Sequence, residues 1–141
     1  MLDNQGTNIR YLRLSVTDRC NLRCRYCMPA EGVCKRAHSE MLSFEELIEI
    51  VRAAVSLGVS KVRLTGGEPL VRRGIMDLCR SLRAINGVRE LTMTTNGALL
   101  PQYAAELKQA GVDRLNISLD TLNEDKFASL TRGGSLADTL A

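Results

Sequence analysis

The sequence lacks the features that mark secreted or membrane-spanning proteins. Its first residues have neither the basic region nor the apolar core of a signal peptide, and no apolar run approaches the ~20 residues that span a bilayer. Five cysteines are present, an odd number that argues against a complete disulfide framework. These absences predict a cytoplasmic protein with free thiols and no membrane partner.

The sequence also has a small net charge and little histidine. The net charge of the 141 residues is only +3, which gives no support to nucleic acid as a partner. The phosphate-binding pattern G-x4-G-K-S/T does not occur. His38 is the sole histidine, so zinc would have to bind mainly through cysteines. The length and the 45% hydrophobic content suit one globular domain.

The most informative stretch holds three cysteines within eight residues, in the pattern C-x3-C-x2-C at Cys20, Cys24 and Cys27. Thiolates spaced this closely can converge on one metal centre. A four-iron cluster normally takes four cysteines, so three would leave one iron open to a small molecule. An open coordination position is typical of catalytic metal sites and not of structural ones.

Other metal sites are compatible with these cysteines. Zinc could bind the same three thiolates with Cys34 or His38 as its fourth ligand. A ferredoxin-like electron-transfer site would need C-x2-C-x2-C and a distant fourth cysteine, and the first gap here is one residue too long. Cys79 lies in an apolar helical stripe, so we expect it in the core and not at a metal.

Strand and helix patterns alternate along the chain. An alternating run at 11–16 predicts a first strand, and a capping box of Ser43 and Glu46 predicts a helix that ends at Gly58. A helix-ending glycine followed by a strand then occurs three times, and helical patterns separate and follow these copies. The strand copies are 58–65, 87–94 and 111–118, and the helical stretches are 75–84, 102–110 and 123–130. This alternation predicts an α/β fold with about four parallel strands.

Distinctive residues follow each expected strand. In parallel α/β sheets the carboxyl ends of the strands carry the functional groups. Those ends would hold the cysteine loop, 65–69, 94–97 and 118–120, which should therefore face one mouth. Gly66 and Gly67 would let a ligand approach the backbone closely, and the Glu68 carboxylate could accept from an ammonium or a hydroxyl. An ordinary strand-to-helix turn is the alternative.

Arginines accompany these segments. Arg13 and Arg63 alternate with apolar residues on two expected strands, and a pair of guanidinium groups suits phosphate or carboxylate recognition. Plain surface placement is the alternative. Arg19, Arg23 and Arg25 surround the cysteines, where their charge is expected to lower the thiol pKa values and offset the charge of a thiolate-bound cluster. Solvated loop charge is the alternative for these three.

Together the motifs resemble the radical S-adenosylmethionine (radical SAM) superfamily. The two short patterns behind the resemblance are C-x3-C-x2-C after the first strand and Gly-Gly-Glu-Pro after the second. Longer strings narrow it to the GTP 3′,8-cyclase family of molybdenum cofactor biosynthesis. These are LSVTDRCNLRCRYCMP at 14–29, LTGGEPL at 64–70, TTNG at 94–97 and RLNISLD at 114–120. The resemblance extends from about Ile9 to the end of the chain.

The resemblance implies a lyase that converts GTP to (8S)-3′,8-cyclo-7,8-dihydroguanosine 5′-triphosphate. An electron from a reductant such as flavodoxin or ferredoxin would release a 5′-deoxyadenosyl radical, which takes hydrogen from C3′ of GTP. A [4Fe-4S] cluster and S-adenosylmethionine are the implied cofactors. By position, Cys20, Cys24 and Cys27 would hold the cluster; Tyr26, Gly66, Gly67, Glu68 and Ser118 would contact S-adenosylmethionine; Arg13, Arg63 and Thr94 would contact GTP.

The chain departs from the family pattern in its length. The family has a second [4Fe-4S] cluster bound by cysteines nearer the C-terminus, and neither Cys34 nor Cys79 matches that motif. The expectation is that residues 1–141 form an incomplete radical SAM core domain, a partial (βα) barrel without its C-terminal half, that is inactive alone. A full-length form is compatible with a homodimer. The rivals are another radical SAM enzyme with a different substrate and a non-enzymatic zinc-binding module.

Overall fold

The fold is an open parallel sheet covered by helices. The structure, a computed structural model, describes residues 4, 6, 8–33 and 40–141. Each strand pairs in parallel with the strand that follows it in the chain, in the order β1-β2-β3-β4. The strands are β1 (Tyr11–Ser15), β2 (Lys61–Thr65), β3 (Glu90–Thr95) and β4 (Arg114–Ile117). The predicted α/β class with about four parallel strands is therefore confirmed.

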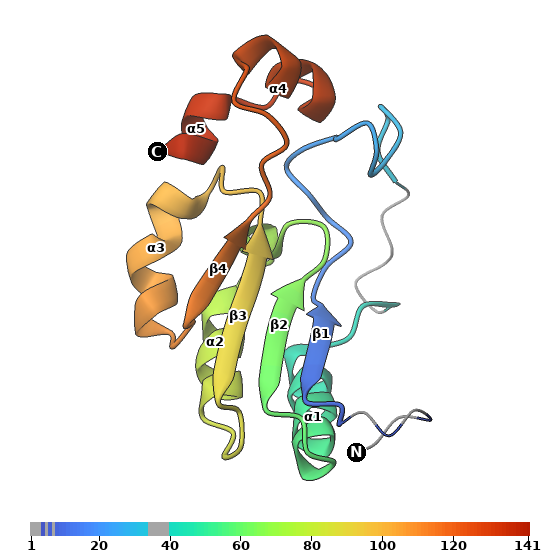
Figure 1. Ribbon diagram of the computed structural model, residues 1–141, viewed down its shortest axis with the longest axis vertical. Coiled ribbons are helices and arrows are strands. Elements are labelled where there is room, and N and C mark those ends of the chain that lie inside the picture. Colours follow the sequence, from blue (N-terminus) through green and yellow to red (C-terminus); the bar gives the residue numbers. More distant parts are fainter. Residues whose placement is uncertain (1–3, 5, 7, 34–39) are drawn as a thin grey trace.

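Helices connect the strands and continue beyond the last one. Figure 1 shows α1 and α2 behind the sheet, α3 beside β4, and α4 and α5 beyond the carboxyl ends of the strands. The helices are α1 (Phe44–Ser56), α2 (Ile75–Arg83), α3 (Leu100–Gln109), α4 (Glu124–Thr131) and α5 (Leu136–Leu140), and a short 3-10 helix, η2 (Pro69–Val71), precedes α2. Among the described residues, none of these helices is both long and apolar enough to cross a membrane.

Local sequence signals account for the helix boundaries. The capping box of α1 forms as predicted: the Ser43 hydroxyl accepts from the Glu46 N–H at 3.2 Å, and the Glu46 carboxylate accepts from the Ser43 N–H at 2.7 Å. The three repeated glycines, Gly58, Gly87 and Gly111, all have positive φ just before a strand begins. Gly58 and Gly111 come directly after the C-caps of α1 and α3, as predicted, whereas Gly87 lies four residues beyond the end of α2.

The two faces of the sheet differ in character. The face against the helices buries the core side chains Leu14, Val62, Leu64, Leu91 and Met93. On the other face, the strand register places polar side chains in a row across all four strands. That row is Arg13, Arg63, Thr92 and Arg114. The helices cover the first face. The second face carries polar side chains and is therefore available for a binding site.

Candidate functional site

The cysteine loop begins alongside the end of β2. Three backbone hydrogen bonds extend the pairing beyond β1: Val16 N–H to Thr65 O at 2.8 Å, Gly67 N–H to Thr17 O at 2.7 Å, and Glu68 N–H to Arg19 O at 2.8 Å. This pairing continues to the residue before the first cysteine. It fixes Cys20 at the carboxyl edge of the sheet, beside the segment that follows β2.

Gly66 and Gly67 make this close approach possible. A Cβ on Gly67 would lie 2.1 Å from the Arg19 carbonyl oxygen, and a Cβ on Gly66 would lie 2.4 Å from the Thr17 carbonyl oxygen. Gly66 also has φ of +148°, a conformation that other residues rarely adopt. The space that the sequence interpretation gave to a ligand is taken here by the backbone of the cysteine loop. Contact of either glycine with S-adenosylmethionine stays a prediction.

The far end of the cysteine loop is attached to the end of α4. The Arg23 N–H donates to Thr131 O at 3.1 Å. The Arg132 guanidinium donates to the carbonyls of Arg23, at 2.7 Å, and of Met28, at 2.8 Å. Arg132 itself has φ of +57°, in the left-handed region that ends α4. The loop is therefore held between β2 on one side and α4 on the other.

Two thiols of the loop, those of Cys20 and Cys24, have pKa values above the ordinary cysteine value. Burial is the main cause that raises the pKa of Cys20 and of Cys24, and the neighbouring thiol in each case, Cys24 or Cys27, raises it further. The expectation that flanking arginines lower these pKa values is wrong for Cys20 and Cys24. The Arg23 guanidinium instead donates to the backbone carbonyls of Cys20, at 2.7 Å, and Leu22, at 2.9 Å.

The cysteines supply the right donors for an iron–sulfur cluster. Cys20 and Cys24 are half-buried and Cys27 is exposed, so the loop is accessible, and thiolate sulfur is the usual protein ligand of such clusters. Within the described part of the chain, no three His, Cys, Asp or Glu side chains are placed to hold a metal ion. Binding would thus draw the thiols together and release their protons. Cys34 and His38, the alternative fourth zinc ligands, lie outside the described residues.

Glu68 is buried at the centre of the strand ends, with 1% of its surface exposed. One carboxylate oxygen accepts from the Thr95 hydroxyl at 2.8 Å and from the Leu70 N–H at 3.1 Å. The other accepts from the Asn96 N–H at 2.8 Å. Both oxygens are thus committed to protein groups, and the carboxylate joins the segment after β2 to the end of β3. Sequence reasoning had assigned no role to Thr95 or Asn96, and only the TTNG string pointed to them.

Tyr26 and Ser118 come to the same edge of the sheet from distant parts of the chain. The Tyr26 hydroxyl donates to Asp120 Oδ2 at 2.5 Å, and this hydrogen bond is the main cause that raises the pKa of Tyr26. The Ser118 N–H donates to Thr95 O at 2.9 Å. The cysteine loop and the segment after β4 therefore meet. Asp120, which the sequence indicated only as part of the strand end 118–120, is the partner of Tyr26.

The residues predicted to contact GTP lie on the polar face of the sheet. Arg13 and Arg63 are paired in register on β1 and β2. The Arg63 guanidinium donates to the Thr92 hydroxyl at 3.3 Å and lies 5.5 Å from the centre of the Tyr11 ring. Thr94 is two residues further along β3 and has the same parity as Thr92. This arrangement brings two cations and hydroxyl groups to one face, below the cysteine loop.

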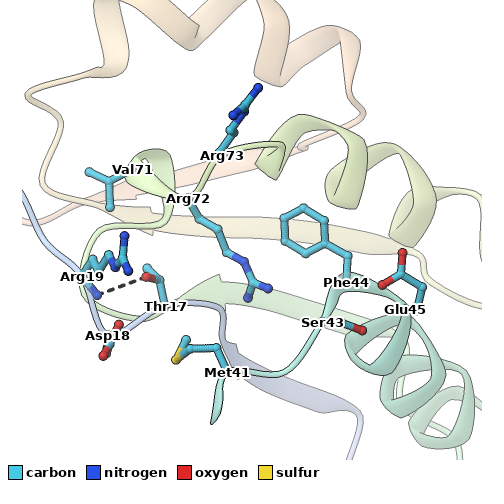
Figure 2. A pocket seen from close by; sticks show the side chains of 10 residues that line it. All are labelled: Thr17, Asp18, Arg19, Met41, Ser43, Phe44, Glu45, Val71, Arg72 and Arg73. Carbon is cyan, nitrogen blue, oxygen red and sulfur yellow. Dashed lines mark hydrogen bonds between the residues drawn. The ribbon is translucent and has the colours of Figure 1, made fainter. Parts of the chain in front are cut away.

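A hollow of about 380 Å³ lies outside this group of residues (Figure 2). It is bounded by the start of the cysteine loop, the first residues of α1 and the segment between η2 and α2. Arg72 enters it, with its guanidinium 4.3 Å from the centre of the Phe44 ring and hydrogen bonds to the carbonyls of Val16 and Leu42. None of the predicted site residues, all of them described, lines this hollow. A smaller hollow of about 190 Å³ does reach Cys20.

Comparison with known proteins agrees with this arrangement. GTP 3′,8-cyclase of Peptoclostridium acidaminophilum is 60% identical over 140 residues, which are 99% of this chain and 43% of the relative. GTP 3′,8-cyclase of Geobacter sulfurreducens is 59% identical with the same coverage. The chain thus spans about 43% of the length of these curated relatives.

Solved structures share the fold. SuiB of Streptococcus suis bound to S-adenosylmethionine superposes with a TM-score of 0.69 at 23% identity, over 89% of this chain and 27% of that one. HydG, a maturase of the [FeFe]-hydrogenase, gives 0.71 at 18% identity, over 92% of this chain and 32% of that one. Identities this low show the fold alone. The Radical SAM superfamily model, however, matches residues 14–141, and the chain belongs to that superfamily.

Proposed function

We propose that this chain is the cluster-bearing N-terminal part of a GTP 3′,8-cyclase that acts in molybdenum cofactor biosynthesis. The observation that carries the proposal is the identity of 60% and 59% with two curated cyclases over almost the whole chain. The cofactors are those of the superfamily, a [4Fe-4S] cluster and S-adenosylmethionine. A radical SAM core domain that includes residues 1–141 is part of the same proposal.

Cys20, Cys24 and Cys27 would hold the cluster in this proposal. The bound cluster and S-adenosylmethionine would supply a carbon-centred radical able to take hydrogen from the ribose of GTP. The protein's own part is to position the loop. Backbone pairing with β2 fixes the residues before Cys20, and Arg132 fixes those on either side of Cys24 and Cys27.

S-adenosylmethionine would lie at the carboxyl edge of the sheet. Tyr26 within the cysteine loop, Gly66 and Gly67 after β2, and Ser118 after β4 would contact it, since these three segments meet at this edge. The predicted contact of Glu68 with S-adenosylmethionine stays part of this proposal; its carboxylate also supports this edge, because it ties the segment after β2 to the end of β3. A buried and fully hydrogen-bonded carboxylate suits a supporting role of this kind.

GTP would lie against the polar face of the sheet. Arg13 and Arg63 provide fixed positive charge for phosphate groups, and Thr94 provides a hydroxyl near the strand ends. The remainder of the protein would add the second cluster. We further propose a flavodoxin or ferredoxin as reductant, a homodimer for the full-length protein, and a cytoplasmic location without nucleic acid as a partner.

The test is anaerobic reconstitution of the full-length protein, followed by addition of dithionite, S-adenosylmethionine and GTP. We expect 5′-deoxyadenosine to form while GTP is consumed. Cys24→Ala should abolish both, whereas Cys79→Ala, which changes a buried cysteine outside the loop, should keep both. Formation of 5′-deoxyadenosine without loss of GTP would keep the superfamily chemistry and reject the substrate. A colourless protein that binds zinc and no iron would reject the proposal.

A further inference from the structure

Asn96 follows β3, and each polar group of its backbone and side chain forms a hydrogen bond. Its backbone N–H donates to Glu68 Oε2 at 2.8 Å, and its backbone carbonyl accepts from the Thr139 hydroxyl at 3.3 Å. Its side-chain oxygen accepts from the Ala98 N–H at 3.0 Å. Because this oxygen is committed to an N–H donor, the orientation of the amide is set and the Nδ2 group points to the other side.

The Nδ2 group of Asn96 reaches the cysteine loop. It donates to Asn21 Oδ1 at 2.8 Å and lies 3.9 Å from the sulfur of Cys20, within range of an N–H···S hydrogen bond. The Leu22 N–H donates to the same sulfur at 3.4 Å. The Cys20 sulfur thus faces two N–H groups, one from its own loop and one from a turn 76 residues further along the chain.

We propose that Asn96 is a positioning residue for the first cysteine of the motif. Its amide fixes the Cys20–Asn21 segment against the turn after β3, and it donates to the Cys20 sulfur when that sulfur is a cluster ligand. The inference rests on the proposed function, because it assumes that the loop holds an iron–sulfur cluster. Hydrogen bonds to the sulfurs help to set the reduction potential of such clusters.

The direction of the effect follows from charge. Reduction adds negative charge to the cluster and its thiolates, and an N–H donor stabilises that negative charge. Loss of the Asn96 amide should therefore make the cluster harder to reduce. The backbone N–H of Asn96 stays bound to Glu68 whatever the side chain is, so a side-chain change can separate this role from folding of the turn.

The variant for the test is Asn96→Ser in the full-length protein. A serine hydroxyl can accept from the N–H two residues on, as the asparagine oxygen does here, but it is too short to reach Cys20. Asn86→Ser is the matched control, because Asn86 is exposed and precedes β3 at the opposite end of the sheet. The measurements are iron and sulfide content, circular dichroism, and the midpoint potential from a redox titration followed by electron paramagnetic resonance.

We expect Asn96→Ser to fold and to give a midpoint potential more negative than the wild type, while Asn86→Ser matches the wild type. A folded Asn96→Ser variant that retains less iron than Asn86→Ser would equally support a positioning role. Asn96→Asp keeps the acceptor for Ala98 but replaces the donor by a carboxylate, so its shift should have the same sign and be larger.

Unchanged iron content and unchanged potential in Asn96→Ser would overturn the inference. Unfolding of both Asn96 variants beside a folded Asn86→Ser would overturn it too, because the side chain would then serve the turn alone. Failure of the proposed function looks different: the wild-type protein itself would take up no iron, and the inference would fall with it.

Discussion

The Tyr26 hydroxyl donates to Asp120 Oδ2 at 2.5 Å across 94 residues of chain, and so joins the cysteine loop to the segment after β4. Both side chains are exposed, so the hydrogen bond should contribute at most about 1 kcal/mol to stability. We expect Tyr26→Phe and Asp120→Ala to lower the free energy of unfolding by similar small amounts. The double variant should cost little more than either single one, because each change removes the same contact.

Urea unfolding of the four proteins in this cycle measures the coupling. Tyr11→Phe, which removes a hydroxyl from a half-exposed tyrosine on β1, is the control for the loss of a phenol group. Strict additivity of the two single changes would show that the Tyr26–Asp120 contact does not form in solution.

Gly67→Ala should be among the most damaging small substitutions. Its Cβ would lie 2.1 Å from the Arg19 carbonyl oxygen, and that backbone atom cannot rotate away as a side chain could. Relief requires the cysteine loop to move off β2, which breaks the Gly67–Thr17 and Glu68–Arg19 hydrogen bonds. We expect the free energy of unfolding to fall by about 3 kcal/mol or more in a denaturant titration.

Gly133→Ala is the matched control for that change. Gly133 has positive φ, +101°, which Gly67 does not, and an added Cβ there would meet nothing within 4 Å. Its cost should be limited to backbone strain of about 1–2 kcal/mol. Equal losses in the two variants would mean that the close approach of the loop to β2 is not what constrains Gly67.

Glu68→Gln should destabilise the protein although it keeps the size of the side chain. The new amide group must face either the Asn96 N–H or the Leu70 N–H, so a buried donor loses its acceptor. The expected loss is about 1–3 kcal/mol in chemical denaturation. Glu49→Gln, on the exposed side of α1 beside Arg52, should change stability by less than about 0.5 kcal/mol. A Glu68→Gln variant as stable as the wild type would show that the buried carboxylate is not needed for stability.

Cys79 should make the protein less stable in alkali. Burial raises the pKa of this thiol from its ordinary value of 9.0 to about 12. As the pH rises above 9.0, the unfolded chain releases the Cys79 proton while the folded chain retains it, so the equilibrium shifts toward unfolding. Below that pH the stabilisation is fully present, and above it stability should fall by up to about 1.4 kcal/mol per pH unit.

Denaturant titrations at pH 8, 9 and 10 test this dependence, with Cys79→Ala and Cys27→Ala compared to the wild type. Cys79→Ala should have the shallower loss of stability with pH, whereas Cys27→Ala controls for the removal of an exposed thiol. The pKa values of Cys20 and Cys24 are also raised, so part of the slope should remain. Identical slopes in all three proteins would contradict the prediction.

Short-range patterns predicted most of the fold. The alternation in β1, the capping box at Ser43 and the helix-ending glycines depend on residues within a few positions of one another, so the sequence displays them directly. Position along the strands also placed Arg13 and Arg63 on one polar face.

The contacts within the site could not be predicted in the same way. The partners of Glu68, Tyr26 and Arg132 lie 28, 94 and 109 residues away, and no local period encodes such pairs. Gly66 and Gly67 are an example. Because glycine has no side chain, the sequence suggested room for a ligand there. Only the fold shows that the backbone of Thr17 and Arg19 occupies that space. Convergence of the three cysteines on a cluster stays a prediction.

The matching order of strands in the sheet and in the chain has a consequence for synthesis. Each strand leaves the ribosome when its neighbour has already been made, so the sheet can grow from one side as translation proceeds. The cysteine loop is the exception. It is made directly after β1, but its clamp at Arg132 appears 109 residues after Arg23. Arg132 can therefore hold the loop only after the 109 residues that follow Arg23 have been translated.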